Sequence, residues 1–215
     1  MNILRASCFA ALLACSAGAA VAQEAYNACG PLENHYGPFD YRTQKVQLRI
    51  VEKFHFTPKV EALIRGESGD FVGGDLSYTL ATSPNHHRAL VALVRFGERT
   101  KSSKPPDMTY SIDCYFDRAV RFAPDDSVVR ALYGRYLGKN GKSEVAVGQL
   151  EEASRLAAEN GFSHHNIGLV YFELSMFDKA LSEAWLARQM HFEGDELEQM
   201  LKRAGKWREP EQPKQ

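Results

Sequence analysis

Apolar residues in the C-terminal half of the chain recur with the spacing of a helix that buries one face. Over 133–153 they fall three and four residues apart, and the same arrangement returns over 167–187. Turn-forming residues divide each stretch, at 139–142 and at 175–178. No run of alternating β-branched residues interrupts the pattern. The pattern predicts two helical hairpins and argues against an α/β fold.

Small residues repeat within these hairpins at a separation of 34 positions. A glycine or an alanine allows two helices to approach more closely than a larger side chain would. A fixed period of this length is typical of stacked helical repeats. The pairs with this separation are Gly134 and Gly168, Ala146 and Ala180, Ala153 and Ala187, and Ala119 and Ala153.

A longer hairpin is predicted directly before these two. Leu90 and Leu93 mark its first helix, and 112–119 has the apolar spacing of its second helix. A polar, proline-rich segment at 101–107 separates the two helices and predicts an extended loop between them.

The two ends of the repeat region carry weaker signals. Thr57 and Pro58 have the sequence of an N-cap followed by a first-turn proline, which predicts a degenerate first hairpin over 57–83. That hairpin is interrupted by the turn-rich segment 66–69. A final helix is expected over 194–206, where a polar-backed cap would cover the exposed apolar end of the stack.

From Thr57 to Trp207 these residues resemble the tetratricopeptide repeat (TPR) family. The segments 37–42, 55–58, 83–90 and 203–207 are not generic for that family, and they resemble a group of exported TPR proteins of Gram-negative bacteria that has no assigned activity. The resemblance implies an all-α, TPR-type α-solenoid of about four helical hairpins plus a C-terminal capping helix, with an irregular N-terminal arm. It also implies a concave face that binds peptides or proteins.

The N-terminal residues predict export. Arg5 precedes a short apolar core, and Ala20-Val21-Ala22 has the form of a signal-peptidase site. The core is shorter than the roughly 20 residues of a membrane span, so we expect a Sec signal peptide and a periplasmic or secreted product. A lipoprotein signal ending at Cys15 is the alternative, which the bulky Leu13 disfavours. The expected organisation is signal peptide 1–22, extended arm 23–56, TPR-like domain 57–206 and disordered tail 207–215.

Two cysteines, Cys29 and Cys114, remain after removal of the signal peptide. An even pair in an oxidising compartment predicts one disulfide, and the alternative is two unpaired thiols. In the repeat register Cys114 points away from its partner helix, where the arm could reach it. We therefore expect the arm to pack on the solenoid, although it could instead fill the groove.

A basic stripe stands out in a slightly acidic chain. Removal of Arg5 leaves 27 acidic residues in slight excess over the basic ones, which gives no general attraction to nucleic acid. The stripe predicts capture of a carboxylate, from an acidic peptide or a C-terminus, by bidentate arginine contacts. A solvated helix face with partners such as Glu98 is the alternative, and no Asn of the TPR carboxylate clamp is present. The TPR resemblance, in which the first helix of each hairpin lines the concave face, implies the partner-binding residues Arg88, Arg95, Arg99, Arg135, Lys139, His165 and Phe172.

Other chemistry finds little support in the sequence. The histidine pairs 86–87 and 164–165 point about 100° apart within a helix, so neither pair chelates a metal readily. His164 occupies a packing position and is expected to be buried. No nucleophile elbow, zinc motif or P-loop occurs. We expect a non-enzymatic scaffold with no cofactor, no metal and no membrane span; the alternatives are an enzyme or small-ligand site between arm and groove, and a self-associating structural subunit.

Overall fold

The computed structural model describes residues 29–69 and 71–210, and these residues form helices and connecting segments without any strand. The predicted all-α class is confirmed. Residues 1–28, which include the predicted signal peptide, and residues 211–215 lie outside the described part. The helices are α2 Lys45–His55, α3 Pro58–Glu61, α4 Val72–Thr82, α5 His87–Thr100, α6 Ile112–Phe122, α7 Ser127–Lys139, α8 Ser143–Ala157, α9 Gly161–Glu173, α10 Phe177–Gln189 and α11 Glu196–Arg203.

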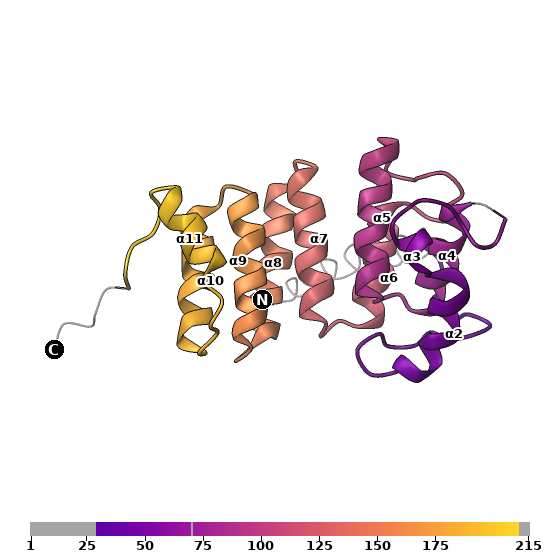
Figure 1. Cartoon of the computed structure of the whole chain (residues 1–215), viewed down its shortest axis with the longest axis horizontal. Coiled ribbons are helices and arrows are strands. Elements are labelled where there is room, and N and C mark those ends of the chain that lie inside the picture. The colour runs from indigo at the N-terminus through magenta and orange to yellow at the C-terminus, as the bar shows by residue number, and fades with distance from the viewer. Residues whose placement is uncertain (1–28, 70, 211–215) are drawn as a thin grey trace, which may run out of the picture.

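The helices follow one another along the long axis of the molecule in sequence order (Figure 1). Helix α7 packs closely against α8, and α9 packs closely against α10. The first helices of successive units, α5, α7 and α9, also contact one another in that order. These first helices therefore lie side by side along one face of the stack.

The small residues of the two regular hairpins occupy equivalent places. A Cβ atom on Gly134 would lie 3.1 Å from the carbonyl oxygen of Ala146, and one on Gly168 would lie 3.4 Å from that of Ala180. Both glycines therefore face the backbone of the second helix at the same point of the hairpin. The prediction from the 34-residue spacing is confirmed at these positions.

The C-terminal cap forms where it was expected. Leu197 and Leu201 of α11 have no exposed surface and join the apolar core beneath α9 and α10. Residues 207–209, predicted to be disordered, pack on the same end instead: Trp207 is partly buried, and the indole nitrogen of Trp185 donates to the carbonyl oxygen of Arg208 at 3.1 Å. The boundary of the predicted tail is thus wrong for these residues.

The N-terminal arm differs from the prediction. Residues 45–55 form helix α2, whose buried residues Leu48 and Val51 face α4. The first unit is therefore α2 with α4, and it begins at Lys45 rather than at Thr57. Helix α3, which begins after Thr57, is a single turn within the connection.

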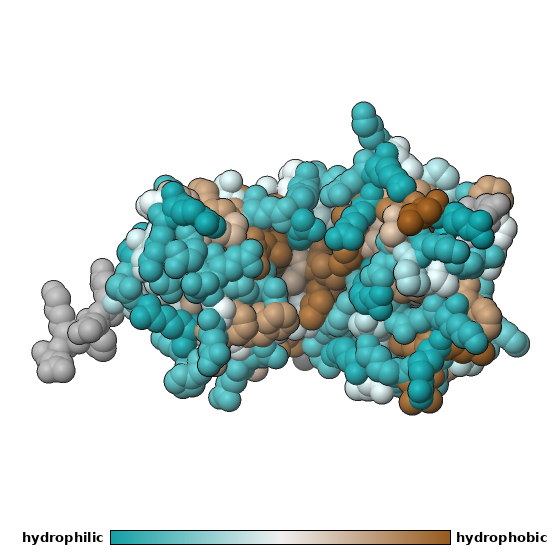
Figure 2. Space-filling model, viewed as in Figure 1, coloured by the Kyte–Doolittle hydropathy of each residue, from teal (hydrophilic) through white to brown (hydrophobic). Residues whose placement is uncertain are grey.

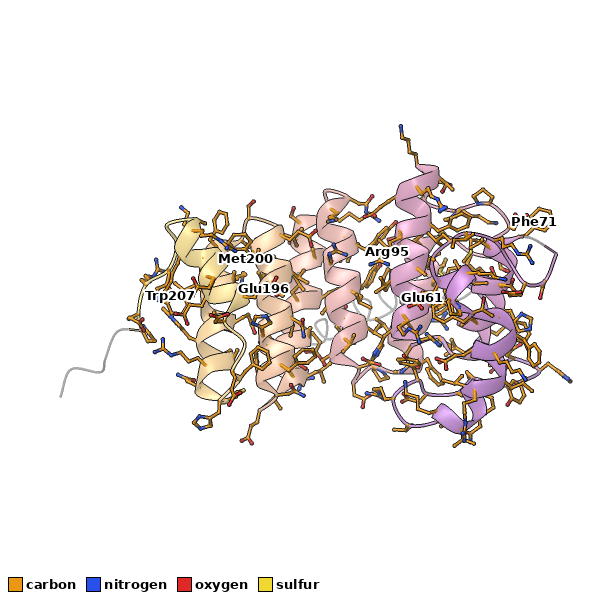
Figure 3. The ribbon with its side chains drawn as sticks, in the orientation of Figure 1. Glu61, Phe71, Arg95, Glu196, Met200 and Trp207 are labelled. Carbon is orange, nitrogen blue, oxygen red and sulfur yellow. A yellow bond between two sulfur atoms is a disulfide. The ribbon has the colours of Figure 1, made fainter. Side chains whose placement is uncertain are left out.

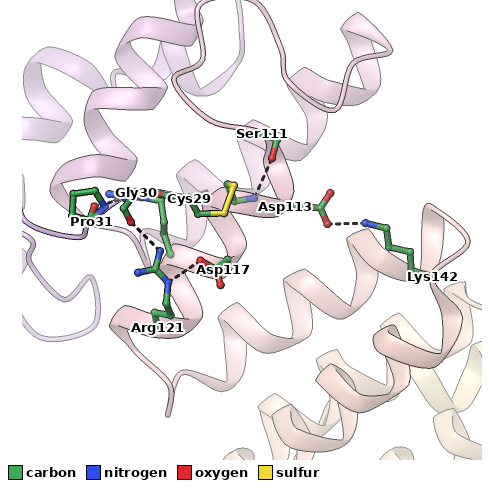
Figure 4. The surroundings of a disulfide bond; sticks show 10 residues. Cys29, Gly30, Pro31, Ser111, Asp113, Asp117, Arg121 and Lys142 are labelled. Carbon is green, nitrogen blue, oxygen red and sulfur yellow. Dashed lines mark hydrogen bonds and ion pairs between the residues drawn. A yellow bond between two sulfur atoms is a disulfide. The ribbon is translucent and has the colours of Figure 1, made fainter. Parts of the chain in front are cut away.

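The segment 29–44, which we call the strap, begins against α6 and continues past the C-terminal end of α4. Cys29 and Cys114 form a disulfide with Cα atoms 5.0 Å apart, as predicted (Figure 4). Arg118 of α6, only 3 % exposed, donates to the carbonyl oxygens of Cys29 and Pro31. Arg121 donates to the carbonyl oxygen of Gly30 at 3.2 Å. The described part of the arm is packed on the solenoid.

Candidate peptide-binding groove

Two adjoining clefts run along the face formed by α5, α7 and α9. The α5/α7 cleft has a volume of about 430 Å³, and the α7/α9 cleft one of about 560 Å³. Leu132 and Arg135 of α7 line both clefts, so the two are continuous, and together we call them the groove. Figure 2 shows brown hydrophobic surface in the hollow between α5 and α7. No residue of the strap lines either cleft.

The floor of the groove is apolar. Helices α7 and α9 contribute Val128 and Phe162, which are 39 % and 61 % exposed. Hydrophobic side chains left this accessible in the lining of a cleft are typical of ligand-binding sites. The other apolar lining residues are Val91, Val94, Ile112, Ala131, Leu132, Ile167, Leu169 and Val170.

Arg95 is a free cation of the groove, and the exposed Lys101 at the end of α5 is another. Arg95 lines the α5/α7 cleft from α5 and is exposed, and among the described residues it has no hydrogen-bonded or ion-paired partner. Figure 3 shows Arg95 between α5 and α7. A guanidinium in this position can receive a carboxylate in a bidentate manner.

Arg135 and Lys139 already hold a carboxylate. The Nε and Nη2 atoms of Arg135 donate to the two carboxylate oxygens of Glu173 at 2.5 and 2.9 Å, and Nζ of Lys139 lies 2.6 Å from Oε1. These hydrogen bonds, Arg135 first, lower the pKa of the Glu173 carboxyl to about 2. A side chain of α9 therefore occupies the two cations that were predicted to bind a ligand.

The other two arginines of the predicted stripe do not line the groove. Arg88 pairs with Glu61, with Nε 2.9 Å from Oε1, and both terminal nitrogens of Arg99 donate to the carbonyl oxygen of Leu63 at 2.7 and 2.8 Å. Leu63 has a positive φ of 58°. Arg88 and Arg99 thus hold the connection between α3 and α4. The prediction of one five-residue stripe is wrong for these two, because their partners come from a segment with no readable pattern.

His165 and Phe172 are also misplaced in the prediction. His165 is 6 % exposed, its ring lies 4.8 Å from that of Phe192, and burial lowers the pKa of its imidazole. Phe172 packs edge-on against Phe177 at 5.3 Å. Phe172 lines a shallow hollow toward α11, where Figure 3 labels Glu196 and Met200. Neither residue lines the groove.

His164 is the buried core residue that the repeat register predicted. Its Nε2 donates to the carbonyl oxygen of Ala158 at 2.8 Å, and its Nδ1 lies 2.7 Å from Oε2 of Glu183. His164 and Glu183 are 3 % and 6 % exposed. The pair joins α9 to α10 and the turn after α8, and its role is in packing.

A buried polar network at the other end of the stack was not predicted. Asn85, with no exposed surface, accepts a hydrogen bond from the backbone amide of Tyr41 at 2.9 Å. Its amide nitrogen donates to Asp40 at 2.8 Å and to Asp126 at 3.0 Å. One side chain therefore ties the strap to the loops before α5 and α7.

His86 caps α5 from within this network. Its Nδ1 accepts from the amide of Ala89 at 3.2 Å, so the ring proton is on Nε2, which donates to Glu52 at 3.1 Å. Burial lowers the pKa of His86 to about 3. Asp126 caps α7 in the same way. The sequence does carry a signal for these two helix caps, because His86 and Asp126 each follow a proline by two residues, at Pro84 and Pro124.

The architecture defines the class of protein as a helical stack with a groove along one face. No protein-family model matches the chain, and neither a curated protein nor a solved structure matches it. Across 29–69 and 71–210, no helix has both the length and the hydrophobicity to cross a membrane. In the same residues no three His, Cys, Asp or Glu side chains are grouped to hold a metal ion.

Proposed function

We propose that the protein is an exported TPR-type scaffold that binds a peptide or protein partner in the groove. The observation that carries this proposal is the combination of an accessible apolar floor with the unpaired Arg95. The repeat assignment is supported by the 34-residue period and by the equivalent places of Gly134 and Gly168. Export is supported by the N-terminal sequence and by the disulfide.

The groove favours a ligand that carries both a carboxylate and an apolar side chain. Arg95 would receive the carboxylate, from an acidic residue or a free C-terminus, in the α5/α7 cleft. An apolar side chain two or three residues away would enter the α7/α9 cleft beside Val128 and Phe162. Glu173 would compete with any ligand carboxylate for Arg135, which lies between the two clefts.

A peptide array tests this function directly. The array carries each sequence with a free C-terminal carboxylate and again as a C-terminal amide, with acidic and neutral variants of both. We expect selection of carboxylate-bearing peptides that contain a large apolar residue. Arg95→Glu should abolish that selection, because it replaces a free cation with a repelling charge. Lys104→Glu is the matched control, since Lys104 is exposed on the nearby loop and lines neither cleft.

Two outcomes of this array would count against the proposal. The first is binding that does not distinguish carboxylate from amide or apolar from polar peptides. The second is equal loss of binding in the Arg95 and Lys104 variants. The lowered pKa of His86 does not support the alternative of an enzyme site between arm and groove, because that ring caps α5 and lines neither cleft.

A further inference from the structure

Exposed apolar side chains gather in the first helical unit. Of the nine large hydrophobic residues exposed in the described chain, six lie within 46–78. Val46, Ile50 and Phe54 of α2 are 68 %, 55 % and 52 % exposed, and their spacing of four places them in one stripe. The opposite face of α2 is the one buried against α4. The outer stripe has no cover from the described residues.

The stripe continues onto α4. Tyr78 is 40 % exposed, and together with Ile50 and Phe54 it lines a cleft of about 340 Å³. Tyr36 of the strap and His55 complete this cleft. We call Val46, Ile50, Phe54 and Tyr78 the α2 patch. An apolar surface of this kind on a folded protein marks a contact with another protein or with a membrane.

Positive charge borders the α2 patch. Arg49 and Lys53 are exposed on α2, and neither has an acidic partner among the described residues. The ammonium of Lys45, in contrast, lies 3.0 Å from the ring centroid of Tyr41. The acidic residue of the same helix, Glu52, accepts a hydrogen bond from the buried His86. The charge beside the α2 patch is therefore not compensated within the described chain.

We propose that the α2 patch docks on a membrane surface that contains anionic lipid. The apolar side chains of α2 would enter the boundary between headgroups and acyl chains, and Arg49 and Lys53 would be attracted by acidic headgroups. A second copy of the chain fits this surface poorly, since it would bring two sets of the same cations together. Four side chains also form a small surface compared with the roughly 800 Å² that each partner buries in a stable complex. The proposal does not depend on the groove.

Co-sedimentation of the mature chain with lipid vesicles tests the proposal. One set of vesicles contains phosphatidylcholine alone, and the other contains phosphatidylcholine with phosphatidylglycerol. We expect binding only to the second set, weakened by added salt. Arg49→Gln combined with Lys53→Gln should lower the partition coefficient about 30-fold, at roughly fivefold for each charge. Lys101→Gln combined with Lys104→Gln is the matched control and should change it less than about twofold.

A second matched pair of variants tests the contribution of the apolar side chains to vesicle binding. Ile50→Asp should lower the partition coefficient more than about tenfold, whereas Val145→Asp, at a side chain 53 % exposed on α8, should leave it unchanged. Circular dichroism checks that each variant remains folded. Absence of binding to the anionic vesicles, or equal loss in both aspartate variants, overturns the proposal. A dimer seen by light scattering without vesicles and dissociated by Ile50→Asp would overturn it as well, in favour of a second copy.

Discussion

At the C-terminal end of the stack, α9 meets α10 where Gly168 faces the backbone of Ala180, and α11 closes the core with Leu197 and Leu201. At the N-terminal end, α2 and α4 enclose side chains such as Asp75, which accepts from the amides of Glu67 and Ser68 at 2.6 and 3.1 Å. One end is thus held mainly by close apolar packing and the other by buried hydrogen bonds with a disulfide.

This difference has an energetic consequence. Close packing of apolar surfaces depends little on pH or redox state, whereas buried polar groups lose their partners when a proton or a covalent link changes. Of the side chains with no exposed surface, the polar ones are Asp75, Thr79, Thr82, Ser83, Asn85 and His86. All of them lie in α4 or in the loop between α4 and α5. We therefore expect the N-terminal end to respond more strongly than the C-terminal end to changes in pH and redox state.

Removal of the disulfide should have the largest effect. Cys29 and Cys114 close a loop with a sequence separation of 85, and release of such a loop is expected to destabilise the fold by about 4 kcal/mol. The double variant Cys29→Ser with Cys114→Ser should show this loss in urea unfolding. Hydrogen exchange should accelerate in α2, α4 and α6 and remain slow in α9 and α10. Uniform acceleration along the chain would contradict the difference between the ends.

Mild acid should destabilise the N-terminal end next. The pKa of His86 is lowered to about 3 from its ordinary value of 6.5. Between these two pH values the imidazole is protonated in the unfolded chain and neutral in the folded chain. The contribution of the neutral His86 to the free energy of unfolding is therefore complete above pH 6.5 and is lost as the pH falls toward 3. Between pH 6.5 and 4.5 the loss should be about 2 kcal/mol.

Replacement of the cap isolates this effect. His86→Asn keeps a side chain that can accept from the helix amides but does not titrate. Urea unfolding across the same pH range should give a flatter profile for His86→Asn than for the wild type. His165 at the other end also has a lowered pKa and adds a loss of the same sign to both proteins. Parallel profiles for the two proteins would show that His86 is not the titrating cap.

The regular hairpins should be destabilised by substitutions that cause steric overlap between their two helices. A Cβ atom on Gly134 would lie 2.6 Å from Cγ of Leu150, so Gly134→Ala should cost roughly 1–2 kcal/mol despite the better helix propensity of alanine. Gly148 of α8 has nothing within 4 Å of such a Cβ, and Gly148→Ala should stabilise by about 0.5–1 kcal/mol. Thermal unfolding at two pH values measures both changes, which should not depend on pH. Changes of the same sign in the two variants would contradict the packing role of Gly134.

The same difference explains what the sequence could predict. The regular hairpins were predictable because Gly134 and Ala146 constrain each other within a short stretch of chain. The N-terminal end depends on contacts between distant residues, such as Asn85 with Tyr41 and Arg118 with Cys29, and no local pattern reports them. An exception is the repeat of a proline two residues before His86 and Asp126, which marks two equivalent caps.

The groove was also predictable in part. Arg95, Arg135 and Lys139 were assigned to the groove from the TPR resemblance, in which the first helix of each hairpin lines the concave face, and they do line the α5/α7 cleft. Their charge partners were not predictable, because Glu173 comes from the following unit. Arg99 was also assigned to the groove. Its guanidinium instead donates to the carbonyl oxygen of Leu63, in the irregular connection of the first unit.

Glu173 should give the smallest effect on stability and the sharpest one on binding. Its carboxylate and the Arg135 guanidinium are each more than a third exposed, so Glu173→Gln should destabilise by less than about 1 kcal/mol. If Glu173 competes with a ligand, the same change frees Arg135 and Lys139 and should raise the affinity for an acidic peptide about fivefold. Glu151→Gln, which removes an exposed partner of Lys179 outside the groove, is the matched control and should do neither. Fluorescence anisotropy with a peptide selected by the array measures the affinity. A loss of affinity would mean that Glu173 orients Arg135 for the ligand, and the groove would then resemble the N-terminal end, where polar contacts within the chain build the structure.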